Sequence, residues 1–473
     1  MEEIIKPVNE RLSAILEGLP FTLNKGQMVF LNSYISGNGH FTLLGEGGSG
    51  KSLVLSVLKK YYGQEALTVA LSGVANQNLF EGKGGDGTLH KCLSLPLGMA
   101  SARDLKEVSQ TCSGIFAKSD LIRHIWVDEA FMMNPDMLNT LLHRVRRFNK
   151  RSANRSARNI RILLCGDPLQ APAITSEEEK HYLRKNYGHH LMFKSEVWER
   201  FNPTVCVLPE VMRQGCRIFK AALEVIRFGQ EDRYDGVLKW LNKRVNYRYD
   251  KSGFTVACYN KVVDQVNGRV LALSSGRKLV YRAQVEGEFD FKENGIEPEI
   301  TLAVGLDCIT TVNCPEGHYN NGSFCTITDL NTEFATCRFH HTGEEHQVPL
   351  HEYEQHESYV EVGVEQEDGT LKDELHRRKL GTCSQISLKQ ASAFSIHRAQ
   401  GRTFNKKGVL DIGWGFKPDK DFGDHLLYVG LSRFTDVNLI TLPRPLKKEH
   451  IKVCRESADF WMETVNAWEE NSA

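Results

Sequence analysis

A short glycine-rich segment constrains this chain more than any other feature, because it has the pattern of a phosphate-binding loop. Residues 45–52 are Gly-Glu-Gly-Gly-Ser-Gly-Lys-Ser, which fits GxxxxGK[ST]. The apolar run His40–Leu44 precedes the loop, and a helical pattern over Lys51–Tyr62 follows it. A strand, a loop and a helix in this order point backbone N–H groups and a helix N-terminus at a phosphate. We therefore predict a nucleotide site on a parallel α/β sheet.

The loop residues have separate expected roles. Lys51 should reach the β- and γ-phosphates, and Ser52 should hold Mg²⁺. The remaining loop residues expected to contact the nucleotide are Gly45, Gly47, Gly48, Ser49 and Gly50. Upstream, Gln27 in Leu-Asn-Lys-Gly-Gln is a candidate for recognising adenine.

Two further strands are predicted to deliver polar side chains to the same site. The strand Ile122–Val127 ends in Asp128, a candidate magnesium ligand, and Glu129, which would orient or deprotonate an attacking water. This pair favours hydrolysis over transfer to a small acceptor. The strand Ile160–Cys165 leads to Gln170, whose amide would contact the γ-phosphate, although the Asp-Pro step before it is also an ordinary turn signal.

Size and composition limit the class of protein. The chain has 473 residues, 59 basic and 59 acidic, which is too long for one core and predicts two or three packed units. It has no run of 18 uncharged apolar residues, and its first residues lack the pattern of a secretory signal. We expect an intracellular protein, cytoplasmic or nuclear, that does not enter a membrane. Its twelve cysteines form no CxxC pair, so inert thiols are favoured over a zinc site.

A basic stripe interrupts this neutral background. Eight basic residues and no acid occur from Arg144 to Arg161. The stripe is interpreted either as a solvated loop or as a surface that contacts phosphates.

Other elements follow from periodicity. Residues 4–16 and 25–36 and the C-terminal tail have helical spacing, and Leu67–Leu71 and Phe254–Cys258 are expected strands. Short alternating runs over about residues 300–384, with the turn signal at 320–322, predict an antiparallel β insertion.

Taken in order, these segments resemble the superfamily 1 helicases. The matching segments are LNKGQ, GEGGSGKS, VALSGVAN, DGTLHK, VDEAF, CGDPLQ and VMRQ, followed far downstream by residues 395–403 and 428–433. Within the superfamily the chain is similar to the 5′-to-3′ branch of RecD, Dda and the petite-integration-frequency helicases, whose SH3-like module the β insertion resembles. The VDEAF segment and the basic stripe also resemble viral RNA-type helicases of the same superfamily. The alternative is therefore such a helicase, or a nucleic-acid-stimulated ATPase that acts on RNA or nucleoprotein.

The resemblance implies an ATP-dependent DNA helicase with two RecA-like domains, which closes on ATP and Mg²⁺ and moves 5′-to-3′ along single-stranded DNA. Expected partners are forks or duplex junctions and replication proteins, with RNA as the alternative, and a monomer is expected. The resemblance implies two arginine fingers, Arg213 and Arg433, and a residue that links the phosphates to the strand, Gly401. The implied strand contacts are Ser72, Thr88, His90 and His397, and Leu97 is expected to form part of the wedge.

The same resemblance suggests domain boundaries. We expect an N-terminal helix within 1–22 and a first RecA-like domain over 23–203, with a wedge insert near 91–118. The second RecA-like domain would cover 204–300 and 385–445. The SH3-like insertion would cover 301–384, and an amphipathic helix would cover 446–473.

Overall fold

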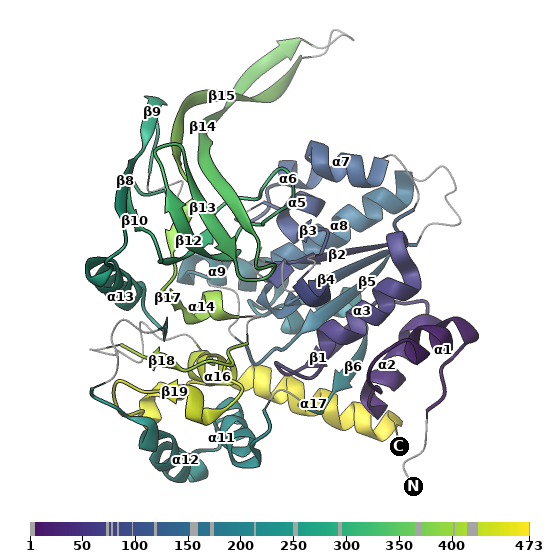
Figure 1. Cartoon of the computed structure of the whole chain (residues 1–473). Coiled ribbons are helices and arrows are strands. Elements are labelled where there is room, and N and C mark those ends of the chain that lie inside the picture. The colour runs from purple at the N-terminus through teal and green to yellow at the C-terminus, as the bar shows by residue number, and fades with distance from the viewer. Residues whose placement is uncertain are drawn as a thin grey trace. The chain divides into compact units, whose positions relative to one another are not determined.

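The computed structural model describes residues 5–472 except 72–74, 77–78, 83–84, 97, 118–120, 152–158, 171–174, 212–213, 249–253, 292–295, 366–370, 401–402 and 414–423. The chain forms two compact units (Figure 1). The first comprises Met1–Asp250, Phe254–Val262 and Phe394–Ala473, and the second comprises Lys251–Gly253 and Val263–Ala393. The domain boundaries suggested by the sequence remain predictions.

The first unit contains a six-stranded sheet whose paired strands all run parallel, in the order β3-β2-β4-β5-β1-β6. The strands are β1 (Phe41–Gly45), β2 (Ala66–Ala70), β3 (Gly87–Thr88), β4 (His124–Asp128), β5 (Arg161–Gly166) and β6 (Thr204–Leu208). The carboxyl ends of β4, β5 and β1 lie side by side, so the segments that leave them meet at one edge of the sheet.

Helices cover both faces of this sheet. Successive strand residues point to opposite sides, and here the residues on both sides are apolar and must be buried. In β4, Ile125 and Val127 belong to one apolar cluster and Trp126 belongs to another. The helices are α1 (Glu10–Glu17), α2 (Lys25–Ser36), α3 (Lys51–Tyr62), α5 (Leu89–Leu93), α6 (Ala102–Lys106), α7 (Gln110–Ala117), α8 (Pro135–Arg151), α9 (Glu177–Tyr187) and α10 (Glu196–Phe201).

The C-terminal helix α17 (Arg455–Ser472) packs back on this unit beside β6 (Figure 1). Its residues Ala458 and Trp461 are buried in the first of the two clusters, and Val465 and Trp468 pack against it. The apolar stripe of the tail therefore faces the body of the protein.

A second, four-stranded sheet completes the first unit, in the order β17-β7-β18-β19. β18 pairs parallel with both β7 and β19. The strands are β7 (Thr255–Ala257), β17 (Ala393–Ser395), β18 (Gly408–Asp411) and β19 (Ile440–Thr441). The helices in its chain segments are α11 (Arg217–Phe228), α12 (Tyr234–Leu241), α14 (Ile396–Ala399) and α16 (Leu426–Ser432).

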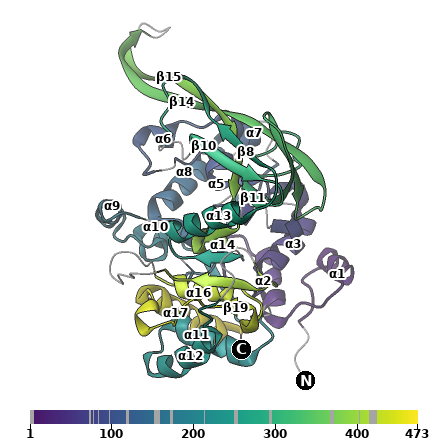
Figure 2. The same cartoon turned by 60° about the vertical axis from the view of Figure 1, so that its left-hand side comes forward.

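The second unit is built from antiparallel strands that follow α13 (Asn260–Leu273). One sheet has the order β10-β8, and the other has the order β16-β11-β12-β13-β14-β15-β9. The strands are β8 (Lys278–Arg282), β9 (Gln284–Gly287), β10 (Glu299–Ala303), β11 (Asp307–Thr310), β12 (Phe324–Leu330), β13 (Phe334–Phe339), β14 (Glu345–Glu365), β15 (Leu371–Ile386) and β16 (Leu388–Gln390). β14 and β15 extend well beyond their neighbours (Figure 2). The antiparallel character predicted here is confirmed, although the pairing begins earlier than expected, at β8.

Two sequence interpretations need correction. The first helix begins at Glu10 and not near residue 4, because Pro7 disfavours a continuous helix and the Asn9 side chain accepts a hydrogen bond from Leu12 N as an N-cap. The basic stripe is also not one solvated surface. Arg144 and Arg161 are buried and donate to backbone carbonyl groups, while Arg146 and Lys150 are exposed. Arg155 and Arg158 lie outside the described residues.

Over the part of the chain that the structure describes, no helix combines the length and the apolar character needed to cross a membrane.

Candidate nucleotide site

The phosphate loop connects β1 to α3 through glycines in conformations that other residues rarely adopt. Gly48 has φ +96°, and Gly50, which precedes α3, has φ +90°. A Cβ atom on Gly50 would lie 2.3 Å from Gln27 Nε2. Glycine is therefore required by both torsion and space.

Gln27 of α2 stabilises the phosphate loop by a hydrogen bond. It is fully buried, and its Nε2 donates to Ser49 O at 3.3 Å while its Oε1 accepts from Asn24 N at 3.1 Å. This residue thus braces the loop, and its contact with adenine remains a prediction.

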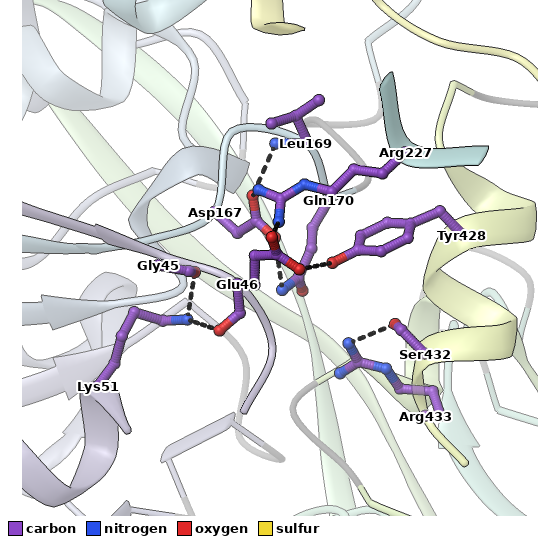
Figure 3. Close-up of polar contacts among 10 residues, drawn as sticks. All are labelled: Gly45, Glu46, Lys51, Asp167, Leu169, Gln170, Arg227, Tyr428, Ser432 and Arg433. Carbon is purple, nitrogen blue, oxygen red and sulfur yellow. Dashed lines mark hydrogen bonds and ion pairs between the residues drawn. The ribbon is translucent and has the colours of Figure 1, made fainter. Parts of the chain in front are cut away.

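The Lys51 side chain curls back over the loop to which it belongs. Its Nζ donates to Gly45 O at 2.6 Å and to Glu46 O at 3.0 Å (Figure 3). These carbonyl groups hold the ammonium next to the position predicted for phosphates. A phosphate anion that approaches the loop would take over these bonds, since its oxygens are charged acceptors whereas the carbonyl oxygens are neutral.

Two adjacent acids lie where β4 ends. Burial, and to a smaller extent the neighbouring Glu129 carboxylate, raises the pKa of Asp128, while Lys51 opposes this shift. Glu129 itself has φ +53°, a left-handed conformation that costs energy for a residue with a side chain. Such strain is common at functional sites, and both carboxyl groups face the same cavity.

The segment after β5 carries Gln170. This residue is buried, and its Nε2 donates to Asp167 Oδ2 at 3.4 Å. Asp167 is also buried, and its Oδ1 accepts from Leu169 N at 3.0 Å. The turn after β5 is therefore organised by Asp167, which leaves Gln170 lining the cavity.

Arg433 follows α16, which belongs to the half of the unit that contains the second sheet. Its side chain is buried, and its guanidinium donates to Val429 O at 3.1 Å and to Ser432 Oγ at 3.0 Å. Burial lowers the pKa of Arg433, and the Glu129 carboxylate opposes that shift.

These residues meet in one cavity of about 240 Å³. It is lined by Gly47, Gly48, Gly50, Lys51, Ser52, Ala75, Asp128, Glu129, Gln170 and Arg433. The structure therefore brings together side chains from the loop, from two strand ends and from α16, with cationic and acidic groups facing one another. Such a polar, concave site fits a triphosphate and a hard cation with oxygen ligands.

The other predicted site residues, which are the strand contacts, the wedge, Arg213 and Gly401, lie only partly in the described part of the chain. Thr88 caps α5, since its side chain accepts from Lys91 N at 3.4 Å, and burial lowers the pKa of His90. His397 lies on α14, with its side chain outside the described part. Residues 72, 97, 213 and 401, which are Ser72, Leu97, Arg213 and Gly401, also lie outside it. Their roles stay predictions.

Sequence reasoning missed one group of residues beside the cavity. Arg227 of α11 pairs with Asp167 and with Glu46, the second residue of the phosphate loop, and Tyr428 of α16 donates to the same Glu46 (Figure 3). A signal did exist. Arg227 lies one helical turn after Leu223, on the buried face of an amphipathic helix, where a charged residue is rare without a partner.

The sequence and the fold are both similar to those of known helicases. Residues 23–229 match the family model for PIF1-like helicases. ATP-dependent DNA helicase PIF1 of Danio rerio is 27% identical over 265 residues, which are 55% of this chain and 38% of that protein. RRM3 of Saccharomyces cerevisiae is 25% identical over 45% of this chain and 28% of its own length. This chain thus spans well under half of either protein.

Other relatives match over most of their length. ATP-dependent DNA helicase Pif1 of Campylobacter jejuni is 25% identical over 431 residues, covering 85% of this chain and 88% of that protein. A crystal structure of Bacteroides Pif1 bound to single-stranded DNA has a TM-score of 0.78 at 21% identity, over 94% of this chain and 98% of that one. The fold of two RecA-like domains with a separate antiparallel β unit is therefore confirmed, as is the resemblance to the Pif1-like branch of superfamily 1. The viral alternative gains no support.

Proposed function

We propose that this chain, whose residues 23–229 match the family model for PIF1-like helicases, is an ATP-dependent DNA helicase. In this proposal it hydrolyses ATP to move 5′-to-3′ along single-stranded DNA and separates the strands of a duplex. The observation that carries the proposal is the single cavity in which Arg433 faces Lys51 and the acids Asp128 and Glu129. A binding pocket alone would not need an arginine supplied from α16.

The cavity residues can share the hydrolysis as follows. Loop amides and Lys51 bind the β- and γ-phosphates of ATP. Ser52 and Asp128 would hold Mg²⁺, which neutralises charge on phosphate oxygens when bound. Glu129 orients a water and takes its proton as the water oxygen attacks the γ-phosphorus, and the bond to ADP breaks. Gln170 donates to the γ-phosphate, and Arg433 stabilises the charge that develops in the transition state.

Arginine engagement links this chemistry to movement. An arginine finger contributes about 10³–10⁵ in rate, or roughly 4–7 kcal/mol. This figure is a lowering of the activation barrier, whereas the free energy for opening base pairs, about 1.4 kcal/mol per step on average, must come from ATP hydrolysis itself. If Arg433 engages only when the two RecA-like domains close, hydrolysis is fast only in the closed form, so each turnover is coupled to one cycle of closing and opening.

Strand contacts in this proposal come from both RecA-like domains. Ser72, Thr88, His90 and His397 would bind the strand through phosphates and stacking, with Leu97 as part of the wedge. Arg213 would be a second arginine finger, and Gly401 would connect the phosphates to the strand.

The proposal is tested by Lys51→Ala and Arg433→Ala. Lys51→Ala should abolish ATP hydrolysis and unwinding while leaving single-stranded DNA binding measurable, because the residue contacts phosphates and not DNA. Arg433→Ala should reduce DNA-stimulated kcat by about 10³-fold or more while the chain still binds nucleotide. The readouts are steady-state ATPase assays and fluorescence anisotropy with labelled DNA.

Lys60→Ala is the matched control, because Lys60 is exposed and lies in the same helix as Lys51. It should behave like the unmodified chain. Full ATPase activity in Lys51→Ala would remove the assignment of the phosphate loop, and full activity in Arg433→Ala would remove the arginine finger.

A further inference from the structure

Arg227 is a fully buried cation that contacts the rim of the nucleotide site without lining it. Its Nη2 lies 2.8 Å from Asp167 Oδ1, and its Nη1 forms an ion pair with Glu46 Oε1 (Figure 3). Its guanidinium carbon also lies 4.2 Å from the centre of the Trp461 ring. A buried guanidinium is costly unless it is paired, so these two carboxylates and the ring account for its presence in the core.

The partners of Arg227 come from separate parts of the site. Glu46 belongs to the phosphate loop, Asp167 follows β5, and Arg227 lies on α11 of the half that contains the second sheet. One guanidinium therefore ties the loop and the β5 turn to the half that supplies Arg433.

The second oxygen of Glu46 extends this network to the arginine finger. Tyr428 Oη donates to Glu46 Oε2 at 3.5 Å. Tyr428 and Arg433 lie five positions apart, on α16 and at its C-terminal end. The Tyr428 hydroxyl thus links α16 to the phosphate loop, and Arg433, at the C-terminal end of the same helix, lines the cavity.

The network also changes the charge of the loop. Glu46 places a carboxylate within a segment that is predicted to bind phosphates, and an uncompensated acid there would repel them. The ion pair with Arg227 neutralises this acid and fixes its direction.

We propose that Arg227 is a positioning residue that, through Glu46 and Tyr428, holds α16 and hence Arg433 in register with the phosphate loop. The inference rests on the proposed ATPase function. Arg227 itself touches no reacting atom, so it acts through Arg433. Its loss should therefore lower kcat, which depends on Arg433, by a larger factor than it raises the KM for ATP. The KM rises because Glu46 loses its neutralising partner, but the loop amides and Lys51 still bind the phosphates.

The test is a double-mutant cycle in the full chain with Arg227→Met and Arg433→Ala. Arg227→Met alone should reduce DNA-stimulated kcat by roughly 5- to 150-fold, the usual range for coupling between sites. The double variant should be no slower than Arg433→Ala alone, because both changes remove the same contribution. Arg217→Met, at an exposed position of α11, is the matched control and should keep full activity.

Two results would overturn the inference. One is a double variant whose loss equals the product of the two single losses, and the other is an unchanged kcat in Arg227→Met. If Arg227→Met does not fold, Glu46→Gln takes its place in the same cycle, since it removes the loop carboxylate but keeps its shape.

A second measurement separates this inference from the proposed function. Without nucleotide, amide hydrogen exchange over Leu426–Ser432 should be faster in Arg227→Met than in Arg217→Met, because α16 has lost its anchor. Equal exchange in the two variants would overturn the positioning role. Absence of DNA-stimulated ATPase in the unmodified chain would instead refute the proposed function, whatever the exchange shows.

Discussion

Single buried residues in this chain depend on partners that their neighbours in sequence do not supply. His124 at the start of β4 is an example. Its Nδ1 lies 2.9 Å from the hydroxyl of Tyr34, which also accepts from Trp126 Nε1 at 2.8 Å. The Arg161 guanidinium lies 4.3 Å from the centre of the same tyrosine ring. Burial, with Arg161 adding to it, lowers the pKa of His124 to about 3.

This environment predicts a pH dependence of stability. In the unfolded chain His124 takes up a proton near pH 6.5, whereas in the folded chain it does so near pH 3. The contribution of neutral His124 to the free energy of unfolding is fully present above pH 6.5 and is lost as pH falls from 6.5 toward 3. Between pH 6.5 and 5 the loss is about 2 kcal/mol. We expect the melting temperature of His124→Asn to fall less steeply over this range than that of the unmodified chain.

The control for this prediction is His181→Asn in α9. His181 is exposed, so its replacement should leave the pH dependence of the melting temperature unchanged. An equally steep fall in His124→Asn and in the unmodified chain would show that His124 does not titrate on unfolding.

At the scale of secondary structure, α8 holds the short helices of the predicted wedge insert. Arg144 of α8 is buried, and its guanidinium donates to Leu93 O at 3.1 Å, Leu105 O at 2.8 Å and Ser94 O at 2.9 Å, and also to Asp104 O. Four carbonyl groups of the segment before and within α6 are thereby satisfied by one side chain. Arg144 belongs to the basic stripe that was interpreted as a possible phosphate-contacting surface, but its side chain instead connects α8 to α6 by hydrogen bonds.

Loss of these hydrogen bonds should loosen the insert. In Arg144→Met the carbonyl groups lose charged donors, each worth about 1.5–3 kcal/mol. We expect limited proteolysis within residues 98–107 to be faster and duplex unwinding to fall, while ATPase activity on single-stranded DNA is largely retained. Arg146→Met, at an exposed position of the same helix, is the control. Unchanged proteolysis in Arg144→Met would contradict this role of Arg144.

At the scale of the molecule, the proposed motor depends on residues from the whole length of the first unit. Its cavity is lined by residues from Gly47 to Arg433, so the chain must fold both sheets of the unit before the site exists. A motor of this kind moves in one direction along its strand, because each domain grips the same backbone polarity.

Direction and strand type can therefore be measured together. We expect strand displacement on a duplex with a 5′ single-stranded overhang and little on the matching duplex with a 3′ overhang. ATPase activity should be stimulated more by a DNA oligomer than by the RNA oligomer of the same sequence. Displacement from the 3′ overhang would reverse the polarity, and stronger stimulation by RNA would favour the RNA-type alternative.

Local patterns in the sequence determined the elements that surround the site. The bounds of α2 and α3 were predicted as observed, and β1, β2, β4 and β5 lie within one or two residues of their predicted positions. The phosphate loop, the two acids and Gln170 were also predicted as parts of one site, and the structure places them around one cavity, while their roles stay predictions. These features are short, and each depends on torsion angles, periodicity or strand ends that neighbouring residues specify.

Tertiary structure alone decided how the charged residues are used. Nothing near Arg144 or Arg161 in sequence indicates which backbone carbonyl groups they bind, and nothing near Arg227 indicates Asp167, which lies 60 residues away. The physical reason is that a buried charge is stable only beside partners that folding brings to it, and those partners come from other elements. The sequence therefore specified which residues could form the site, and the fold specified which of them meet.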